Sequence, residues 1–449
     1  MIYDFKVTGY DSEFNGIIKQ GNNTFKLKRV IDGEMVQADI TLKPNPSARL
    51  TKVIKQSDVR VRPKCEFYLQ CGGCALQHIK YEEQLKMKQV LVSNLFKDTF
   101  NKEYEVLPTI GMNNPYYYRN KNQVVFKNIK GKLSCGMYQS GTHNVINTTN
   151  CYIQDENVDK IIKTIKELMI KQRLSAYDED RHTGLIRHVL IKTSKATKQV
   201  MVVIVVGSDV FPGRSNFIKA LVARHKEITT IIQNTNTRNT NAVLGDKETV
   251  LYGKGYITDI LLGLKFKISS KSFYQINHEQ TEKLYAKAIE LANLTKQDSL
   301  LDAYCGVGTI GLIASSHVLK VTGVELVKDA VTDAIMNAKN NNINNVRFIC
   351  DDATNFMINC ARQKQTFDVV IMDPPRKGSD KPFLDALKKL SPRKVVYISC
   401  NPHTQVEDLK HLLNQYKITK IQPVDMFPHT HHVETVVLLS HKSNTPKLT

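Results

Sequence analysis

Short apolar runs separated by longer amphipathic segments fill the last third of the chain. These runs cover residues 300–303, 321–324, 346–350, 367–372, 394–399 and 433–439. A strand that is covered on both faces reads as a continuous apolar run, and strands that alternate with helices form mostly parallel sheets. The pattern therefore predicts an α/β fold with an open, mostly parallel sheet in this region.

The pattern before residue 276 is different. In residues 1–56, β-type runs at 25–30 and 35–42 flank the turn pair Asp32-Gly33, which is typical of a small β-barrel or sheet. Farther along, periodicity predicts helices at about 76–98, 156–172, 214–226 and 278–294, and strands at 123–126, 188–193 and 200–206. We therefore expect three domains: residues 1–56, a mixed α+β domain over 57–275, and the α/β domain over 276–449.

The charge of the chain is unevenly distributed. The 449 residues include 63 Lys+Arg and 43 Asp+Glu, a net charge of +20. Residues 297–449 hold 18 basic and 15 acidic side chains, so residues 1–296 hold 45 and 28. Such a basic front indicates either a surface that meets a polyanion or a solubilising surface. No apolar run is long enough to span a membrane and no secretory signal is visible, so we expect a cytoplasmic protein.

A glycine-rich loop follows the first predicted strand of the α/β region. The segment Asp302-Ala-Tyr-Cys-Gly306-Val-Gly308-Thr-Ile-Gly311 fits G-x-G-x-x-G, and Glu325 ends the next strand. Glycines allow a tight turn and close approach of a nucleoside, while the carboxylate can accept hydrogen bonds from ribose hydroxyls. The loop predicts an adenosine-type cofactor, either NAD or S-adenosylmethionine, although such glycines also occur in turns that only pack tightly.

Two more loops end strands of the same predicted sheet. Asp373-Pro-Pro-Arg376 follows one strand, and Ser399-Cys400-Asn-Pro402 follows the next. Ligands of open parallel sheets bind beyond the carboxyl ends of the strands, so these loops should meet the glycine loop in one crevice. Cys400 is placed as an exposed nucleophile would be, and hydride transfer has no use for that thiol. The loops favour methyl transfer to a nucleobase, whereas an isolated cysteine is more often inert and buried.

Three further cysteines lie close together around two glycines. Cys65, Cys71 and Cys74 have a spacing that suits zinc or an iron–sulfur cluster. A fourth ligand must come from elsewhere in the chain, and Cys135 and Cys151 are the candidates. The three histidines at 429, 431 and 432 have no cysteine or carboxylate spaced with them, and we interpret them as loop and strand residues.

Taken together, these motifs resemble the S-adenosylmethionine-dependent RNA uracil-5-methyltransferases, specifically the bacterial 23S ribosomal RNA type with an iron–sulfur cluster. The resemblance covers about residues 57–439. It is carried by Cys65-x5-Cys71-Gly-Gly-Cys74, Tyr118-Arg-Asn-Lys121, Ile186-Arg-His188, Ser272-Phe-Tyr-Gln275-Ile-Asn277, Asp302 to Gly308, Asp373-Pro-Pro-Arg376-Lys-Gly378, Ser399-Cys-Asn-Pro402 and His432-Val-Glu434-Thr-Val. The first 55 residues match less well, although Asp32-Gly-Glu34-x-Val36 is similar to the small RNA-binding β-barrel (TRAM domain) of this family.

The resemblance implies a class I, Rossmann-like methyltransferase domain over residues 276–449 and RNA-binding domains before it. It implies Cys400 as the nucleophile that adds to uracil C6 and Glu434 as the base that removes the C5 proton. The implied cofactor contacts are Gln275, Tyr304, Gly306, Thr309, Glu325, Asp352 and Asp373. Cys65, Cys71, Cys74 and Cys151 would hold a [4Fe–4S] cluster, and Arg119, Lys121, Arg187 and Phe273 would contact RNA.

The expected activity is methylation of a specific uridine of 23S ribosomal RNA to 5-methyluridine. We expect a monomer with no obligate protein partner and no membrane contact. A transfer RNA substrate, a non-catalytic RNA-binding protein and an NAD oxidoreductase are the alternatives.

Overall fold

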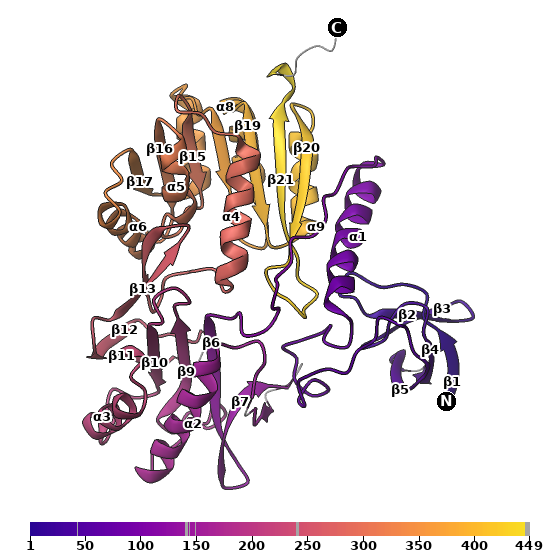
Figure 1. Cartoon of the computed structure of the whole chain (residues 1–449), viewed down its shortest axis with the longest axis vertical. Coiled ribbons are helices and arrows are strands. Elements are labelled where there is room, and N and C mark those ends of the chain that lie inside the picture. Colours follow the sequence, from indigo (N-terminus) through magenta and orange to yellow (C-terminus); the bar gives the residue numbers. More distant parts are fainter. Residues whose placement is uncertain (43, 140–141, 143, 149, 239–241, 445–449) are drawn as a thin grey trace.

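The computed structural model describes residues 1–444 apart from 43, 140–141, 143, 149 and 239–241. Figure 1 shows three regions: an N-terminal β region, a central region below, and a C-terminal sheet flanked by helices above. Within the described part of the chain, no helix is long and apolar enough to cross a membrane.

The N-terminal region has five short strands around one apolar core. They are β1 (Ile2–Lys6), β2 (Gly16–Gln20), β3 (Asn23–Leu27), β4 (Met35–Thr41) and β5 (Ser47–Lys55). The strands form the three-stranded sheet β1-β4-β5 and the hairpin β2-β3. Alternate side chains such as Phe5, Ile18, Phe25 and Val36 point into the shared core. A small β domain is therefore present, and its assignment as a TRAM barrel stays a prediction.

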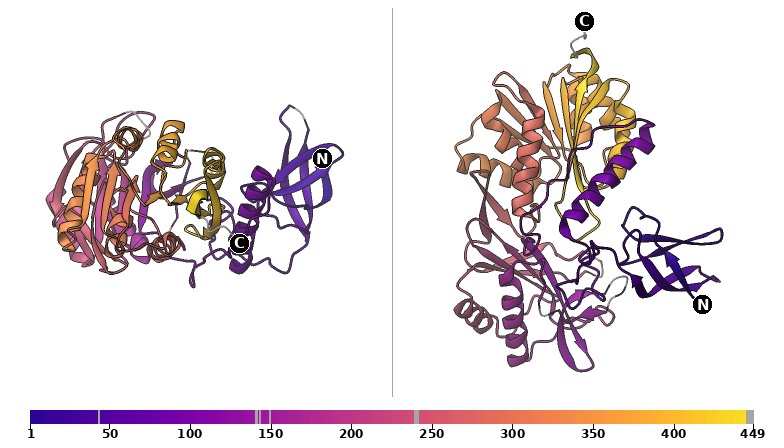
Figure 2. Two further views of the ribbon diagram at one scale, coloured as in Figure 1. Left: turned by 90° about the horizontal axis from the view of Figure 1, so that it is seen from above. Right: turned by 45° about the vertical axis from the view of Figure 1, so that its right-hand side comes forward.

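Helix α1 (Tyr81–Phe100) follows the N-terminal region and packs beside the C-terminal sheet, as Figure 2 shows from two directions. It begins five residues later than the periodicity predicts. The reason is that the backbone of Ala75 and Leu76 bonds to the distant carbonyl of His429 instead of entering the helix. Apolar side chains of α1, among them Val92 and Phe96, belong to the same core as the C-terminal sheet.

The central region is a seven-stranded sheet covered by two helices. Its elements are β6 (Lys121–Ile129), β7 (Lys132–Tyr138), β8 (Val145–Ile146), α2 (Glu156–Lys171), β9 (Ile186–Thr193), β10 (Val200–Val206), α3 (Arg214–Arg224), β11 (Ile228–Thr235) and β12 (Lys247–Tyr252), with strand order β12-β11-β10-β9-β6-β7-β8. α2 and α3 cover one face, and the other face packs on the elements that follow. Both faces of β10 are thus buried, which explains its uninterrupted apolar sequence.

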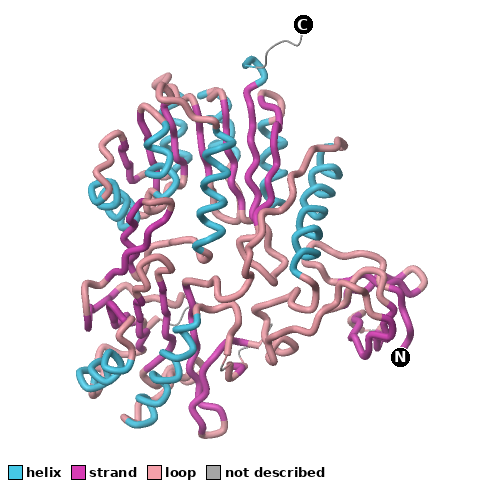
Figure 3. Tube along the Cα trace, in the orientation of Figure 1, coloured by secondary structure: helices cyan, strands magenta, loops and turns pink. Residues whose placement is uncertain are grey.

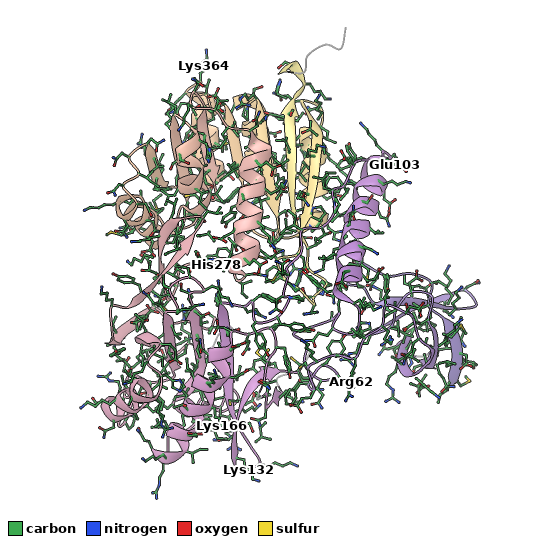
Figure 4. The ribbon with its side chains drawn as sticks, viewed as in Figure 1. Arg62, Glu103, Lys132, Lys166, His278 and Lys364 are labelled. Carbon is green, nitrogen blue, oxygen red and sulfur yellow. The ribbon has the colours of Figure 1, made fainter. Side chains whose placement is uncertain are left out.

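A hairpin and a helix join the central region to the C-terminal sheet. They are β13 (Tyr256–Leu261), β14 (Leu264–Ser269) and α4 (His278–Ala292). His278, the first residue of α4, lies between the two regions in Figure 4. Its Nδ1 is 2.8 Å from the buried carboxylate of Asp259 on β13, so a polar contact ties the hairpin to the helix.

The C-terminal region confirms the predicted open α/β fold. Its elements are β15 (Ser299–Ala303), α5 (Thr309–Ala314), β16 (Lys320–Glu325), α6 (Lys328–Asn340), β17 (Val346–Cys350), α7 (Ala353–Arg362), β18 (Val369–Met372), α8 (Lys381–Leu390), β19 (Lys394–Ser399), α9 (Pro402–Leu412), β20 (Tyr416–Val424) and β21 (Glu434–His441), with 3-10 turns at Ser315–His317 and Lys442–Asn444. The strand order is β17-β16-β15-β18-β19-β21-β20. The pairs among β15–β19 are parallel, whereas β21 is antiparallel to both neighbours.

The loop between β20 and β21, residues 425–433, borders a cavity at the edge of the sheet through Phe427 and is named the active-site loop. In Figure 3 it extends from the sheet into the loops that connect the three regions. Its first residue, Asp425, is fully buried and accepts a hydrogen bond from the equally buried Lys88 of α1 over 2.6 Å. The Tyr81 hydroxyl donates to the same carboxylate over 2.9 Å. Burial lowers the pKa of Lys88, and the charge of Asp425 opposes that shift.

Replacing Lys88 by methionine should destabilise the protein strongly, because it leaves the Asp425 carboxylate buried without a cationic partner. Removing one partner of a buried pair costs about 3–5 kcal/mol of unfolding free energy, measured by urea denaturation. The double variant Lys88→Met/Asp425→Leu should recover most of the loss. Lys97→Met on the same helix, which breaks only an exposed pair with Glu103, is the matched control and should have little effect. Equal losses for Lys88→Met and Lys97→Met would contradict this account.

Candidate active site and cysteine-lined cavity

A cavity of about 650 Å³ lies at the carboxyl edge of the C-terminal sheet. β15, β16, β18 and β19 run in one direction and end at this edge, so the residues at or just after their last positions line it. β21 runs the opposite way, and its first residue, Glu434, therefore reaches the same edge. Among the residues predicted from the sequence, the cavity brings together Phe273, Gln275, Tyr304, Gly306, Thr309, Glu325, Asp352, Asp373, Cys400 and Glu434.

The glycine loop has the tight turn that its spacing predicts. Gly308 has φ +80°, and a Cβ there would lie 2.6 Å from the ring of Phe348. The Gly306 N–H donates to Glu325 over 3.0 Å, and the Val327 N–H donates to the other oxygen over 2.8 Å. Glu325 thus orders the loop in addition to facing the cavity. Such a loop before a helix can hold the ribose and the amino-acid part of a nucleoside cofactor.

Among the lining residues that sequence reasoning missed are Tyr285 and Phe427. Tyr285 is buried on α4 and hydrogen-bonds with Thr309 and Gln275, so it positions two of the expected cofactor contacts. Phe427 comes from the active-site loop. Tyr285 occupies an ordinary apolar position of an amphipathic helix, and Phe427 lies in a loop without regular periodicity. Neither position therefore carried a signal in a single sequence.

Acidic side chains dominate the polar chemistry of the cavity. Burial raises the pKa of Glu434 to about 8, and the neighbouring charge of Asp373 adds to the rise. Burial also raises the pKa of Asp373 to about 7. Beneath the cavity, Asp302 accepts from the Gly311 N–H over 2.7 Å, and burial raises its pKa to about 7. An ionised carboxylate costs much in such a place unless it is paired, so the site suits a cationic ligand.

Cys400 lies between the end of β19 and the start of α9. The Asn401 side chain caps α9 and also donates to the Arg376 carbonyl over 3.2 Å, which fixes the turn that presents the thiol. The pKa of Cys400 is raised to about 11, mainly by burial and also by the charges of Glu434 and Asp373, while Arg376 opposes the rise. The thiol needs a cation beside it, or fewer negative charges, to become a nucleophilic thiolate.

The expected RNA contacts have different environments. Phe273 is 68% exposed at the cavity, so its ring is free to stack on a base. Lys121 is exposed, and its pKa is lowered by burial of its ammonium group and by the nearby Arg119. Arg187 is only 3% exposed: its guanidinium donates to Glu179 and to two backbone carbonyls. The guanidinium of Arg187 is thus engaged in internal hydrogen bonds, and its contact with RNA stays a prediction.

A second, smaller cavity lies between the central region and the segment before α1. Cys65, Cys71, Cys74 and Cys151 line it, together with Tyr68 and other side chains. Burial raises the pKa of Cys74 to about 12, with further contributions from the other three thiols, so the sulfur atoms are near one another. Cys135 is buried in β7 and is not part of the lining. In the described part of the chain, no three His, Cys, Asp or Glu residues are grouped as ligands of a single metal ion.

Comparisons with known proteins agree with the geometry of the larger cavity. The profile of the family described as tRNA (Uracil-5-)-methyltransferase matches residues 244–442. A Clostridium tetani protein described as an uncharacterized RNA methyltransferase is 41% identical over 449 residues, which covers 99% of this chain and 97% of that protein. A Staphylococcus aureus protein with a similar description is 40% identical, over 96% of each chain.

A solved structure also shares the full architecture. It is the Pyrococcus abyssi tRNA (uracil-54, C5)-methyltransferase in complex with S-adenosyl-L-homocysteine, with a TM-score of 0.77 and 26% identity. The superposition covers 97% of this chain and 99% of that one. The chain therefore belongs to the S-adenosylmethionine-dependent RNA uracil-5-methyltransferase family.

Proposed function

We propose that this protein methylates C5 of a specific uridine in 23S ribosomal RNA, with Cys400 as the nucleophile and Glu434 as the base. One observation carries the proposal: the Cys400 thiol and the Glu434 carboxyl line one cavity together with the glycine loop and an exposed Phe273. A nucleophile, a base and a cofactor site are the three elements that methylation of a pyrimidine C5 requires. The protein would act as a monomer in the cytoplasm, with RNA as its partner.

The uracil ring needs activation because its C5 is a poor nucleophile. The Cys400 thiolate adds to C6, and the S–C6 bond makes C5 enolate-like. C5 then attacks the methyl carbon of S-adenosylmethionine, so the C–S bond breaks and S-adenosylhomocysteine leaves. Glu434 accepts the C5 proton, and the C6–S bond breaks to release 5-methyluridine and the thiolate. The uridine must leave its stack to reach this cavity, and Phe273 is placed to stack on it.

The raised pKa values of the Asp373 and Glu434 carboxyls fit this sequence of steps. The sulfonium group of the methyl donor is the cation that the acidic cavity suits, and its binding favours the ionised forms of Asp373 and Glu434. Gln275, Tyr304, Gly306, Thr309, Glu325 and Asp352 would hold the rest of the cofactor. After transfer the sulfur is neutral, so the attraction that held the cofactor weakens and the product can leave.

A transfer RNA substrate is the second candidate, because the solved relative from Pyrococcus abyssi is a tRNA enzyme. The ribosomal substrate is supported by the similarity of the cysteine motif and its surroundings to the 23S type. The N-terminal β region and the central region would bind the RNA. Arg119 and Lys121 would contact it near the cavity, and Arg187 would stabilise the protein surface through its internal hydrogen bonds.

We also propose that Cys65, Cys71, Cys74 and Cys151 hold a [4Fe–4S] cluster. Four thiols line one cavity, and the described residues of its lining include no carboxylate or histidine. All-thiolate ligation is typical of such clusters.

Nucleoside mass spectrometry of 23S, 16S and transfer RNA tests the substrate. In cells without the gene, 5-methyluridine should disappear from 23S RNA alone. Wild-type protein and the control variant Cys350→Ala, which changes an exposed thiol, should restore it, whereas Cys400→Ala should not. Loss of 5-methyluridine from transfer RNA instead would agree with the proposed mechanism but show that the substrate is transfer RNA. Unchanged 5-methyluridine in every RNA fraction would refute the proposed activity.

The affinity for S-adenosylmethionine should rise with pH between about 6 and 9. The carboxyls of Asp373 and Glu434, with pKa values of about 7 and 8 in the free protein, must lose protons to pair with the sulfonium, so binding releases protons and is favoured at higher pH. S-adenosylhomocysteine, with a neutral sulfur, should show a flatter dependence, measured by calorimetry. Glu434→Gln should flatten the curve for S-adenosylmethionine. Parallel pH curves for the two ligands would contradict this electrostatic account.

Protein purified without oxygen should contain about four iron and four sulfide per chain. Cys151→Ser should lose most of this iron, because it removes a thiol that lines the cavity. Cys135→Ser is the matched control and should retain it, since that thiol lies outside the lining. The measurement is metal and sulfide analysis with the visible absorption spectrum. One zinc per chain without sulfide, or iron loss in both variants, would show that the assignment is wrong.

A further inference from the structure

The active-site loop connects the two cavities. Phe427 in this loop lines the larger cavity, and the loop ends at Glu434. Between them, the buried His429 contacts the segment that directly follows Cys74. A change in the position of His429 would therefore alter the walls of both cavities.

The peptide groups on both sides of His429 are bonded to distant parts of the chain. Its N–H donates to the Oε1 atom of Gln84 over 3.1 Å. Its carbonyl accepts from the Ala75 N–H over 2.8 Å and from the Leu76 N–H over 2.9 Å. His429 has φ +66°, a left-handed conformation that is unusual for a residue with a side chain. Such a conformation persists only where surrounding contacts enforce it, and here these three hydrogen bonds do so.

Gln84 lies at the centre of this arrangement. It is completely buried on α1, and its Nε2 donates to the carbonyls of Leu76 and Ile79 over 3.1 and 2.9 Å. The same nitrogen is 3.2 Å from Nδ1 of His429. One amide therefore bonds the 75–79 segment on one side and the active-site loop on the other. Two tyrosines also contact the active-site loop. The Tyr116 ring lies 4.6 Å from the His429 ring, and the Tyr118 hydroxyl donates to the Pro428 carbonyl over 3.1 Å.

We propose that Gln84 is a positioning residue for methyl transfer, and that through it the cysteine-lined cavity sets the position of the active-site loop. This inference rests on the proposed function of the larger cavity. Loss of the Gln84 amide would release His429 from its left-handed conformation and move Phe427 on the cavity wall. The RNA-dependent step then suffers, because the target base must be held against Cys400. Cofactor binding is preserved, because Gly306, Glu325 and Asp352 belong to the β15–β17 end of the cavity.

The test compares Gln84→Leu with Gln89→Leu in the full-length, iron-loaded protein. Gln89 is on the same helix, and its amide donates to the Val106 carbonyl over 2.9 Å, away from the active-site loop. Amide hydrogen exchange of peptides covering 75–79 and 425–433 should be about 10-fold faster in Gln84→Leu than in Gln89→Leu. The kcat for methyl transfer should fall about 10-fold or more in Gln84→Leu alone, with the Kd for S-adenosylmethionine within about twofold of wild type.

A conservative variant and a cysteine variant complete the test. Gln84→Glu keeps an oxygen that accepts from the His429 N–H and should restore part of the exchange protection at 425–433. If Gln84→Leu does not fold, the comparison of Gln84→Glu with wild type tests the inference. Cys151→Ser should also speed exchange at 425–433, whereas Cys135→Ser should not.

Three results would overturn the inference. The first is an equal loss of kcat in Gln84→Leu and Gln89→Leu, and the second is a weaker Kd for the cofactor that accounts for the loss of kcat. The third is an unchanged rate of hydrogen exchange at 425–433 in Gln84→Leu or in Cys151→Ser. Hydrogen exchange needs no RNA. A wild-type protein that methylates no RNA would therefore refute the proposed function. The exchange rates would still show whether Gln84 holds the active-site loop.

Discussion

The rest of the structure depends on how the active-site loop is held in a buried position. A buried backbone must find hydrogen-bond partners, and a loop cannot supply them from its own residues as a helix or a sheet does. Here they come from α1, from the start of α4 and from the segment before the central sheet. Lys88 and Tyr81 of α1 hold Asp425, while Asn277 and Gln280 of α4 donate to the carbonyls of Met426 and Asp425. The hydroxyl of Tyr118, just before the central sheet, holds Pro428. The loop therefore fixes the arrangement of the regions and the shape of the cavity at once.

This dependence has an energetic consequence. The loop keeps a lysine and an aspartate together in the core, where each alone would cost several kcal/mol. The adjoining cavity contains carboxyls whose charges are unpaired until a cation binds. A fold gains little stability from either arrangement, since apolar side chains of similar volume would pack at least as well. Both are understandable as requirements of a site that binds a sulfonium and must hold a base close to a thiol.

The sequence predicted those parts of the molecule whose signal is local. Buried strands such as β15 and β19 read as apolar runs, so the α/β fold could be predicted. The resemblance of the surrounding motifs to a known family pointed to ten residues that line the cavity. β20 was missed because it is an edge strand that contains lysines and Pro423, and an edge position tolerates both. The internal hydrogen bonds of Arg187 also have no local signal in the sequence. Its partners, Glu179 and the carbonyls of Asn236 and Arg238, are brought to it only by the fold.

The choice of RNA must be made outside the cavity. In the proposed reaction, Cys400, Glu434 and the cofactor loop act on uracil and on the methyl donor, and those are the same whichever RNA carries the uridine. The Pyrococcus abyssi protein shares the whole architecture although it is a tRNA methyltransferase. Discrimination therefore has to come from surfaces that reach the nucleotides around the target. Most of the basic excess lies before residue 297, and exposed cations such as Lys132 extend to the far end of the central region in Figure 4. Phosphate contacts over such a distance select an RNA by its shape, and the cavity then requires only that the presented base be a uracil.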